Sequence, residues 1–239
     1  MKPSCNRVFS SILWLAGAWN LSAQTTLKGH WSGSIETPQL SLGVEIDLDN
    51  AASGWIGSIS IPQQGASGIP LAGITFSGGK CSFRIKGAPG DPTFSGTLAA
   101  DGKTVSGDFS QGGSSMAFKI TRTGDAKVEI PKASPAVAAE FVGTWEGTLQ
   151  APAQSLRTIV RITNESDGAH AVLISVDQGN AEIPVTSIEQ KGKHLSLQVN
   201  MAGGGYEADL NAAGTELTGI WTQSGGSLPL SLKKSAAAK

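Results

Sequence analysis

The sequence has few charged residues, and their signs nearly cancel. Charged residues make up 15% of the 239 residues, and the formal net charge is −1 at pH 7. Proteins that bind nucleic acid through its phosphates need a basic stripe or patch. The near-neutral balance therefore argues against nucleic acid as a partner.

The sequence also lacks a hydrophobic run long enough for a comfortable membrane span, which takes about 20 apolar residues. Its clearest apolar run, Val8–Leu21, is shorter and is interrupted by serine and asparagine. The run follows the basic residues Lys2 and Arg7 and precedes the small pair Ser22–Ala23. This pattern predicts a cleaved secretory signal peptide over residues 1–23, with an uncleaved N-terminal anchor as the alternative. We expect a secreted or periplasmic protein without a stable membrane span after cleavage.

Cysteine is nearly absent, with only Cys5 and Cys81 in the chain. Signal cleavage removes Cys5, and one remaining cysteine cannot form an intrachain disulfide. Cys81 alternates with Phe83 and Ile85, which predicts a small buried core residue. A nucleophilic cysteine would need a nearby base, and the sequence indicates none.

Catalytic and metal-binding motifs are missing as well. The spacing of His30, His170 and His194 matches no metal motif, and the patterns CxxC, HExxH and G-x-S-x-G do not occur. Asp47 and Asp49 precede a turn, and we expect them to be solvated or to cap the turn. The sequence therefore predicts a protein that is not an enzyme and that has no metal site and no cofactor.

The chain is instead rich in glycine, with 31 residues, and contains an internal repeat. The stretch GHWSGSIE from Gly29 recurs as GTWEGTLQ from Gly143, and later segments match in the same order. Such self-similarity indicates one structural unit used twice. We predict units over 27–124 and 141–235, joined by a linker or extended strap over 125–140.

Within each unit, apolar residues recur at every second position, as in Val44, Ile46 and Leu48. Strict alternation is typical of half-buried antiparallel strands, and we count about eight strands per unit. Closing such strands into a barrel removes the exposed edges. The predicted fold class is all-β, with two tandem small antiparallel up-and-down β-barrels; β-sandwiches are the alternative. Glycines on the inward face support closure, since they let a strand bend sharply; they are Gly33, Gly57, Gly96, Gly107, Gly147 and Gly219.

Glutamines are the most informative polar residues. Gln111 and Gln223 hold equivalent positions, two residues after Phe109 and Trp221, so a period of two predicts that they point inward near a strand end. A buried amide needs a hydrogen-bond partner. Either each glutamine bonds the backbone of a neighbouring loop, or it meets a ligand at the barrel mouth. Recurrence in both copies favours the first interpretation.

Two further positions complete the candidate site. Gln64 and Gln178 are equivalent and precede the two I-P-[LV] stretches, and Trp55 has Ala169 as its counterpart. The asymmetry at Trp55 indicates that the two units no longer do identical work. The candidate ligand-binding residues are Trp55, Gln64, Phe109, Gln111, Gln178, Trp221 and Gln223.

Two resemblances extend this interpretation. A G-x-W motif ends at Trp31 and at Trp145, and late basic residues follow in each unit, Arg122 in the first and Lys233–Lys234 in the second. This pattern resembles the calycin pattern of lipocalins, fatty-acid-binding proteins and avidins, in which an early tryptophan packs under a late arginine or lysine. The resemblance implies a barrel whose end is closed by a cation on an indole face.

The second resemblance covers most of the chain and is carried by GTWEGTL, SVDQGNAEIPV and GIWTQSGGSLPL, with looser versions in the first copy. The chain looks like the duplicated β-rich segment that precedes the catalytic domain in some secreted bacterial α/β-hydrolase-type proteins. That segment is non-catalytic, so the resemblance implies no enzyme activity. We therefore expect a secreted tandem β-barrel protein that binds a small apolar or amphipathic ligand, such as a lipophilic molecule. The alternative is an accessory module that binds a cell-envelope protein or glycan.

Overall fold

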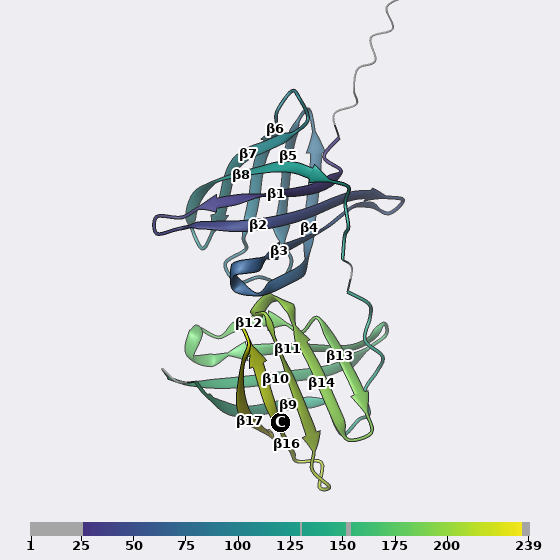
Figure 1. Cartoon of the computed structure of the whole chain (residues 1–239). Helices are drawn as coiled ribbons and strands as arrows, with labels where there is room; N and C mark the ends of the chain where they lie inside the picture. Colours follow the sequence, from purple (N-terminus) through teal and green to yellow (C-terminus); the bar gives the residue numbers. More distant parts are fainter. Residues whose placement is uncertain (1–25, 130, 152–153, 236–239) are drawn as a thin grey trace, which may run out of the picture.

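The structure is a computed structural model, and it describes residues 26–129, 131–151 and 154–235 (Figure 1). The predicted signal peptide over 1–23 lies outside these residues. The described chain is built of β-strands, with three short 3₁₀ turns, η1 (Pro62–Gln64), η2 (Val176–Gln178) and η3 (Asn200–Ala202). Among the described residues, no helix is long or apolar enough to cross a membrane.

The first unit is a closed antiparallel barrel of eight strands, in which each strand pairs with the next along the chain and β8 pairs back with β1. The strands are β1 (Gly29–Glu36), β2 (Ser41–Ala51), β3 (Gly54–Ile61), β4 (Ala66–Ser77), β5 (Lys80–Ile85), β6 (Thr93–Leu98), β7 (Thr104–Gln111) and β8 (Ser114–Gly124). The prediction of a closed up-and-down barrel is confirmed for this unit. A β-sandwich is excluded here because one sheet closes on itself.

The second unit is a single antiparallel sheet of nine strands, in the order β12-β11-β10-β9-β17-β16-β15-β14-β13. The strands are β9 (Gly143–Gln150), β10 (Ser155–Glu165), β11 (Gly168–Ser175), β12 (Ala181–Pro184), β13 (Ser187–Lys191), β14 (His194–Val199), β15 (Gly204–Leu210), β16 (Glu216–Gln223) and β17 (Gly226–Lys234). The terminal strands β12 and β13 are not paired with each other. Two closed barrels were predicted, and for the second unit the structure gives a nine-stranded sheet instead.

The difference arises where the chain changes partner. Val185 N donates to Ala171 O at 3.0 Å, on β11, whereas Thr186 N donates to Gln198 O at 2.6 Å, on β14. The chain therefore steps from one neighbouring strand to the other between two residues. In the first unit β4 spans the same step as one continuous strand, so eight strands close there and nine strands stay open here.

Glycine allows the sheet to curl tightly at equivalent points of the two units. A Cβ atom at Gly33 would lie 2.0 Å from Lys119 O, and one at Gly147 would lie 2.2 Å from Ser231 O. Real Cβ atoms do not approach backbone oxygens so closely, so only glycine fits at these points of the β1–β8 and β9–β17 strand pairs. This close approach gives the physical reason for two of the inward glycines that the sequence contains.

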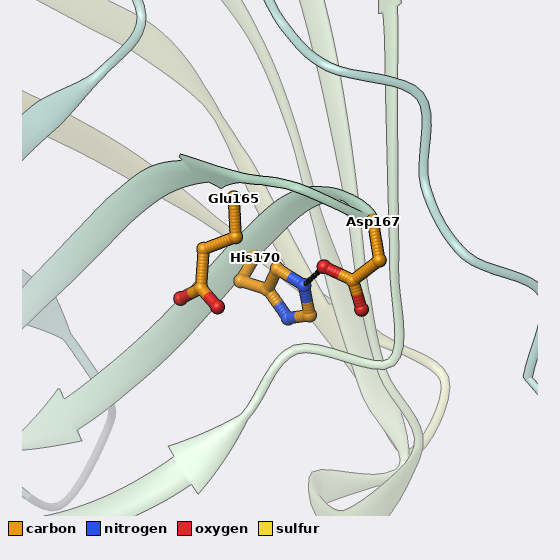
Figure 2. Close-up of side chains that lie close together, drawn as sticks. All are labelled: Glu165, Asp167 and His170. Carbon is orange, nitrogen blue, oxygen red and sulfur yellow. Dashed lines mark hydrogen bonds and ion pairs between the residues drawn. The ribbon is translucent and has the colours of Figure 1, made fainter.

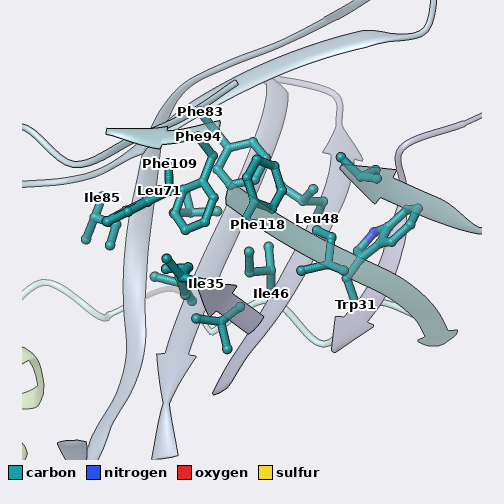
Figure 3. Packing of buried hydrophobic residues seen from close by; sticks show 14 of the residues in the cluster. Trp31, Ile35, Ile46, Leu48, Leu71, Phe83, Ile85, Phe94, Phe109 and Phe118 are labelled. Carbon is teal, nitrogen blue, oxygen red and sulfur yellow. The ribbon is translucent and has the colours of Figure 1, made fainter. Parts of the chain in front are cut away.

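Four phenylalanine rings pack together in the interior of the first barrel. The ring of Phe94 lies 5.0 Å from that of Phe83, 4.7 Å from that of Phe109 and 5.0 Å from that of Phe118, measured between centroids. Figure 3 shows these rings together at one end of the core, above Ile35 and Ile46. Cys81 is also buried, as predicted, and burial raises the pKa of its thiol.

The segment between the units is an extended strap that bonds to both of them. Lys127 N donates to Asp47 Oδ1 at 2.7 Å in the first unit. In the second unit Ser134 forms a β-bridge with Ala169, and its Oγ accepts from Ile188 N at 2.8 Å. Figure 1 shows the strap running along one side of the two units, from β8 to β9. These bonds fix the strap beside the space between the units.

Candidate functional site

Three of the predicted ligand contacts meet at one end of the second unit. Gln178, Trp221 and Gln223 line a cavity of about 140 Å³ there. Trp221 Nε1 donates to Gln223 Oε1 at 3.2 Å, and Gln223 Nε2 donates to Ala202 O at 2.7 Å. The rim of the cavity is thus a chain of hydrogen bonds that begins at an indole and ends on a loop.

The same cavity has two hydroxyl groups in its wall. Thr158 on β10 and Ser175 on β11 are each 6% exposed, and both line the cavity. Ser175 Oγ donates to Gln178 Oε1 at 2.8 Å, and Thr158 Oγ1 donates to Leu156 O at 3.3 Å. Each hydroxyl oxygen keeps lone pairs that can accept a further hydrogen bond. The wall therefore offers polar contacts inside an apolar pocket.

The first unit carries larger or fully apolar side chains at the same places. Thr158 faces Gly147 across the strand pair as Val44 faces Gly33. Ser175 directly precedes η2, as Ile61 precedes η1.

A third change lies on the last strand of each unit. Leu230 pairs with Gly219 as Phe118 pairs with Gly107. The second unit therefore has a serine where the first has an isoleucine, and a leucine where the first has a phenylalanine, and both side chains are the smaller of their pair.

The predicted ligand-binding residues of the first unit lie in different surroundings. Phe109 is buried and packs on Phe94, and Gln111 Nε2 donates to Pro89 O at 3.0 Å. Gln64 lies in η1 with an exposed side chain. Gln111 and Gln223 both bond a neighbouring loop, in agreement with the first of the two interpretations of these residues.

The expectation that Gln111 and Gln223 point inward is wrong. Both side chains are exposed, although Phe109 and Trp221, two residues earlier, are buried. Strands β7 and β16 end at these glutamines, so the alternation carries the amides past the end of the barrel wall. They stand on the rim and not in the interior.

Trp55 lies away from the mouth of the second unit. It is half-buried, and its ring packs edge-on against Phe76 at a centroid distance of 6.2 Å. It lines a cleft of about 810 Å³ between the two units and the strap, and its counterpart Ala169 lines the same cleft. The seven predicted residues therefore lie in three separate regions. Three line the cavity of the second unit, Trp55 lines the cleft, and the other three belong to the first barrel.

The wall of this cleft also carries a cluster of charged groups that the sequence did not indicate. Glu165, Asp167 and His170 lie at the turn between β10 and β11, with one potential ligand atom from each within 4.8 Å of the others (Figure 2). His170 Nε2 is 2.7 Å from Asp167 Oδ1, and this bond lowers the pKa of Asp167 and raises that of His170. The three exposed side chains could contact one divalent cation. Their spacing matches no motif, and the absence of a metal site stays a prediction.

No family model matches the chain, and no curated protein matches it. Among solved structures, the chain is similar to a protein of unknown function from the DUF3598 family of Nostoc punctiforme, with 11% sequence identity and a TM-score of 0.22. The similarity covers 87% of this chain and 96% of that chain. A likeness this distant carries no argument about function.

Proposed function

We propose that the protein is a secreted, non-catalytic binding protein whose second unit takes a small amphipathic molecule at its mouth. One observation carries the proposal: a cavity of about 140 Å³ lies there, between Trp221 and the hydroxyls of Thr158 and Ser175. A fold-keeping role would favour the apolar residues that the first unit has at these positions. The second unit instead buries two hydroxyl groups beside free space, and each hydroxyl oxygen keeps lone pairs that a ligand can use.

The size of the cavity suits a single small ring. A cavity of roughly 150 Å³ is enough for a benzene-sized molecule. The two hydroxyls on β10 and β11 add acceptors for one polar substituent, and the indole of Trp221 supplies an aromatic surface. The ligand class is therefore a small aromatic or cyclic compound with one hydroxyl group. A ligand of this size binds weakly, with a Kd on the order of micromolar to millimolar.

The test is a titration with phenol and with toluene, followed by the NMR signal of the Trp221 indole N–H. We expect a saturable shift with both probes and tighter binding of phenol. Thr158→Val removes a hydroxyl at nearly constant volume, so it should weaken phenol binding by roughly fivefold to tenfold and leave toluene binding unchanged. Ser175→Ile copies the first unit and should abolish the response to both.

Ile61→Val, at the matching position of the first unit, is the control and should leave both titrations as in the wild type. A response that stays linear up to about 10 mM phenol, or that is the same in Ser175→Ile, contradicts the proposal. Secretion is tested separately by N-terminal sequencing of the exported protein, which should begin at Gln24. Recovery of a chain that retains residues 1–23 contradicts that part alone.

A further inference from the structure

The cleft between the two units differs from the mouth of the second unit in size, position and lining. It has a volume of about 810 Å³, within the range of roughly 300–1,000 Å³ that is usual for ligand pockets. We propose that this cleft is a second binding site, which takes a larger amphipathic anion: a molecule with an apolar body and one carboxylate, sulfonate or phosphate group.

The apolar body is accommodated by walls from both units. The first unit contributes Trp55, Ile56 and Pro70 to the lining, and the second unit contributes Val172, Pro184 and Met201. An elongated or multi-ring apolar molecule can therefore contact both units at once. The strap residues Pro131 to Ser134 line the remaining side, so the ligand is enclosed by three separate parts of the chain.

The lining of the cleft contains charged groups of both signs. Its cations are Lys86, Lys132 and Arg161. Among the described residues, none of these has an ion-pair partner within 4.0 Å. The lining also holds three carboxylates, Glu129, Glu165 and Asp167, and Asp167 Oδ1 is 2.7 Å from His170 Nε2. The lining therefore carries three cations and three carboxylates, so an anion is favoured only beside a cation that lies apart from the acidic groups.

The register of the β10–β11 hairpin shows how far Arg161 lies from the acidic turn. Arg161 stands opposite the apolar Val172, and Thr163 stands opposite His170. Glu165 is at the far end of β10, four residues from Arg161, or about 13 Å along the strand. An anionic group beside Arg161 is thus well separated from Glu165. Its apolar body can lie against Val172 at the same time.

Trp55 is the aromatic surface of this site. Trp55 and Ala169 are equivalent in register, because Trp55 stands opposite Asn50 as Ala169 stands opposite Asn164. The second unit folds with alanine at this position, so the fold does not require an aromatic ring there. The half-buried indole is therefore available to a ligand, and its replacement by alanine should be tolerated.

The experiment uses the full chain and two probes that share their rings. 1-Anilinonaphthalene-8-sulfonate carries one sulfonate group, and N-phenyl-1-naphthylamine is the neutral analogue; both become fluorescent in apolar sites. We expect saturable binding of the sulfonate probe at one site. Arg161→Gln should raise the Kd of the sulfonate probe by roughly tenfold or more, because the charge-assisted contact is lost. The Kd of the neutral probe should change by less than about twofold.

Arg157→Gln is the matched control. Arg157 lies on the same strand, is exposed, and pairs with Asp177 at 2.6 Å outside the cleft. This variant should bind both probes as the wild type does, whereas Trp55→Ala should weaken both. Equal affinities of Arg161→Gln and Arg157→Gln for the sulfonate probe overturn the proposal, as does the lack of saturable binding.

Ser175→Ile separates the two sites, because either probe has two fused rings and a third ring and is too large for the mouth cavity. If Ser175→Ile removes the sulfonate binding, the probe occupies the mouth and the cleft proposal is wrong. If phenol does not bind but Arg161→Gln still weakens binding of the sulfonate probe, the cleft proposal stands and the mouth proposal is wrong.

Discussion

The guanidinium group of Arg122 lies over the indole ring of Trp31, with its central carbon 4.5 Å from the ring centroid. The guanidinium also donates to Thr26 O and, through Nε at 3.2 Å, to Gly102 O. The indole in turn donates to Leu27 O at 3.0 Å. A cation, an aromatic face and two backbone segments are therefore joined at one end of the first barrel.

The second unit has the same arrangement with a different cation. Lys234 Nζ lies 5.1 Å from the centroid of the Trp145 ring and donates to Glu140 O at 2.6 Å, while the indole donates to Phe141 O at 2.8 Å. This is the contact that the calycin resemblance implies. Membership of that group stays a prediction, because a cation over an indole occurs in unrelated proteins as well.

Arg122→Ala should lower the free energy of unfolding by about 1–3 kcal/mol, because it removes the cation from the ring and leaves backbone oxygens without a donor. Urea denaturation followed by tryptophan fluorescence measures the change. Arg84→Ala is the control, because Arg84 is exposed and its ion pair with Asp91 is long, at 4.0 Å. This variant should lower the free energy of unfolding by about 0.5 kcal/mol or less. Equal costs for the two variants would show that the ring contact stabilises nothing.

Gly33→Ala should destabilise the first barrel by about 3 kcal/mol or more, or prevent its folding, since the methyl group would collide with the backbone of Lys119. Gly226→Ala is the comparison, because a Cβ there meets nothing closer than 3.4 Å. That variant should stay within about 1 kcal/mol of the wild type. Thermal unfolding by circular dichroism is the measurement, and a mild effect of Gly33→Ala would mean that the strands can move apart.

Stability should fall modestly as the pH rises through the titration of His194. Hydrogen bonds from this imidazole to Asp209 and Glu207, at 3.0 and 2.8 Å, raise its pKa above 6.5. A raised pKa means that the folded state holds the proton more tightly than the unfolded state does. The contribution is therefore complete below pH 6.5 and is lost as the pH passes the folded-state pKa.

The His194 effect should amount to only a few tenths of a kcal/mol, because the pair is exposed and screened by solvent. His194→Gln should flatten this part of the stability profile between about pH 6 and 8. Added salt should flatten it too. A wild-type profile that rises over this range would contradict the assignment.

Tyr206→Phe should lower the free energy of unfolding by about 1–2 kcal/mol, since the buried hydroxyl lies 2.9 Å from Leu230 O and 3.2 Å from Leu217 O. Burial also raises the pKa of this hydroxyl, and Tyr206 is the only tyrosine in the chain. The native protein should therefore show no tyrosinate absorbance at about pH 10, where a free tyrosine is half ionised. Ionisation at that pH in the folded protein would mean that the hydroxyl is accessible to solvent.

Much of the fold could be predicted from periodicity alone. The alternation of Val44, Ile46 and Leu48 places all three in the core, and all three are buried. The prediction that Gln111 points inward was wrong because alternation gives the face of the sheet on which a residue lies, but not the residue at which the strand ends. It also could not predict that the chain would change partner between Val185 and Thr186, since that depends on hydrogen bonds to strands distant in sequence.

The candidate site was only partly predictable. Trp221 and Gln223 could be found because they recur beside Phe109 and Gln111 in the other copy. Ser175 was missed, although its replacement of an inward isoleucine was a usable signal. No signal marked Arg161 as part of a cleft, because its neighbours there belong to the other unit and to the strap.

Local sequence patterns were enough to show that an all-β unit is used twice, because alternation and turn residues act over a few neighbouring positions and are repeated in both halves. They do not show which unit closes, where free space remains, or which charges line the cleft. Those properties depend on how side chains from distant strands fill a shared volume. Local patterns constrain the strands but do not fix the space between them.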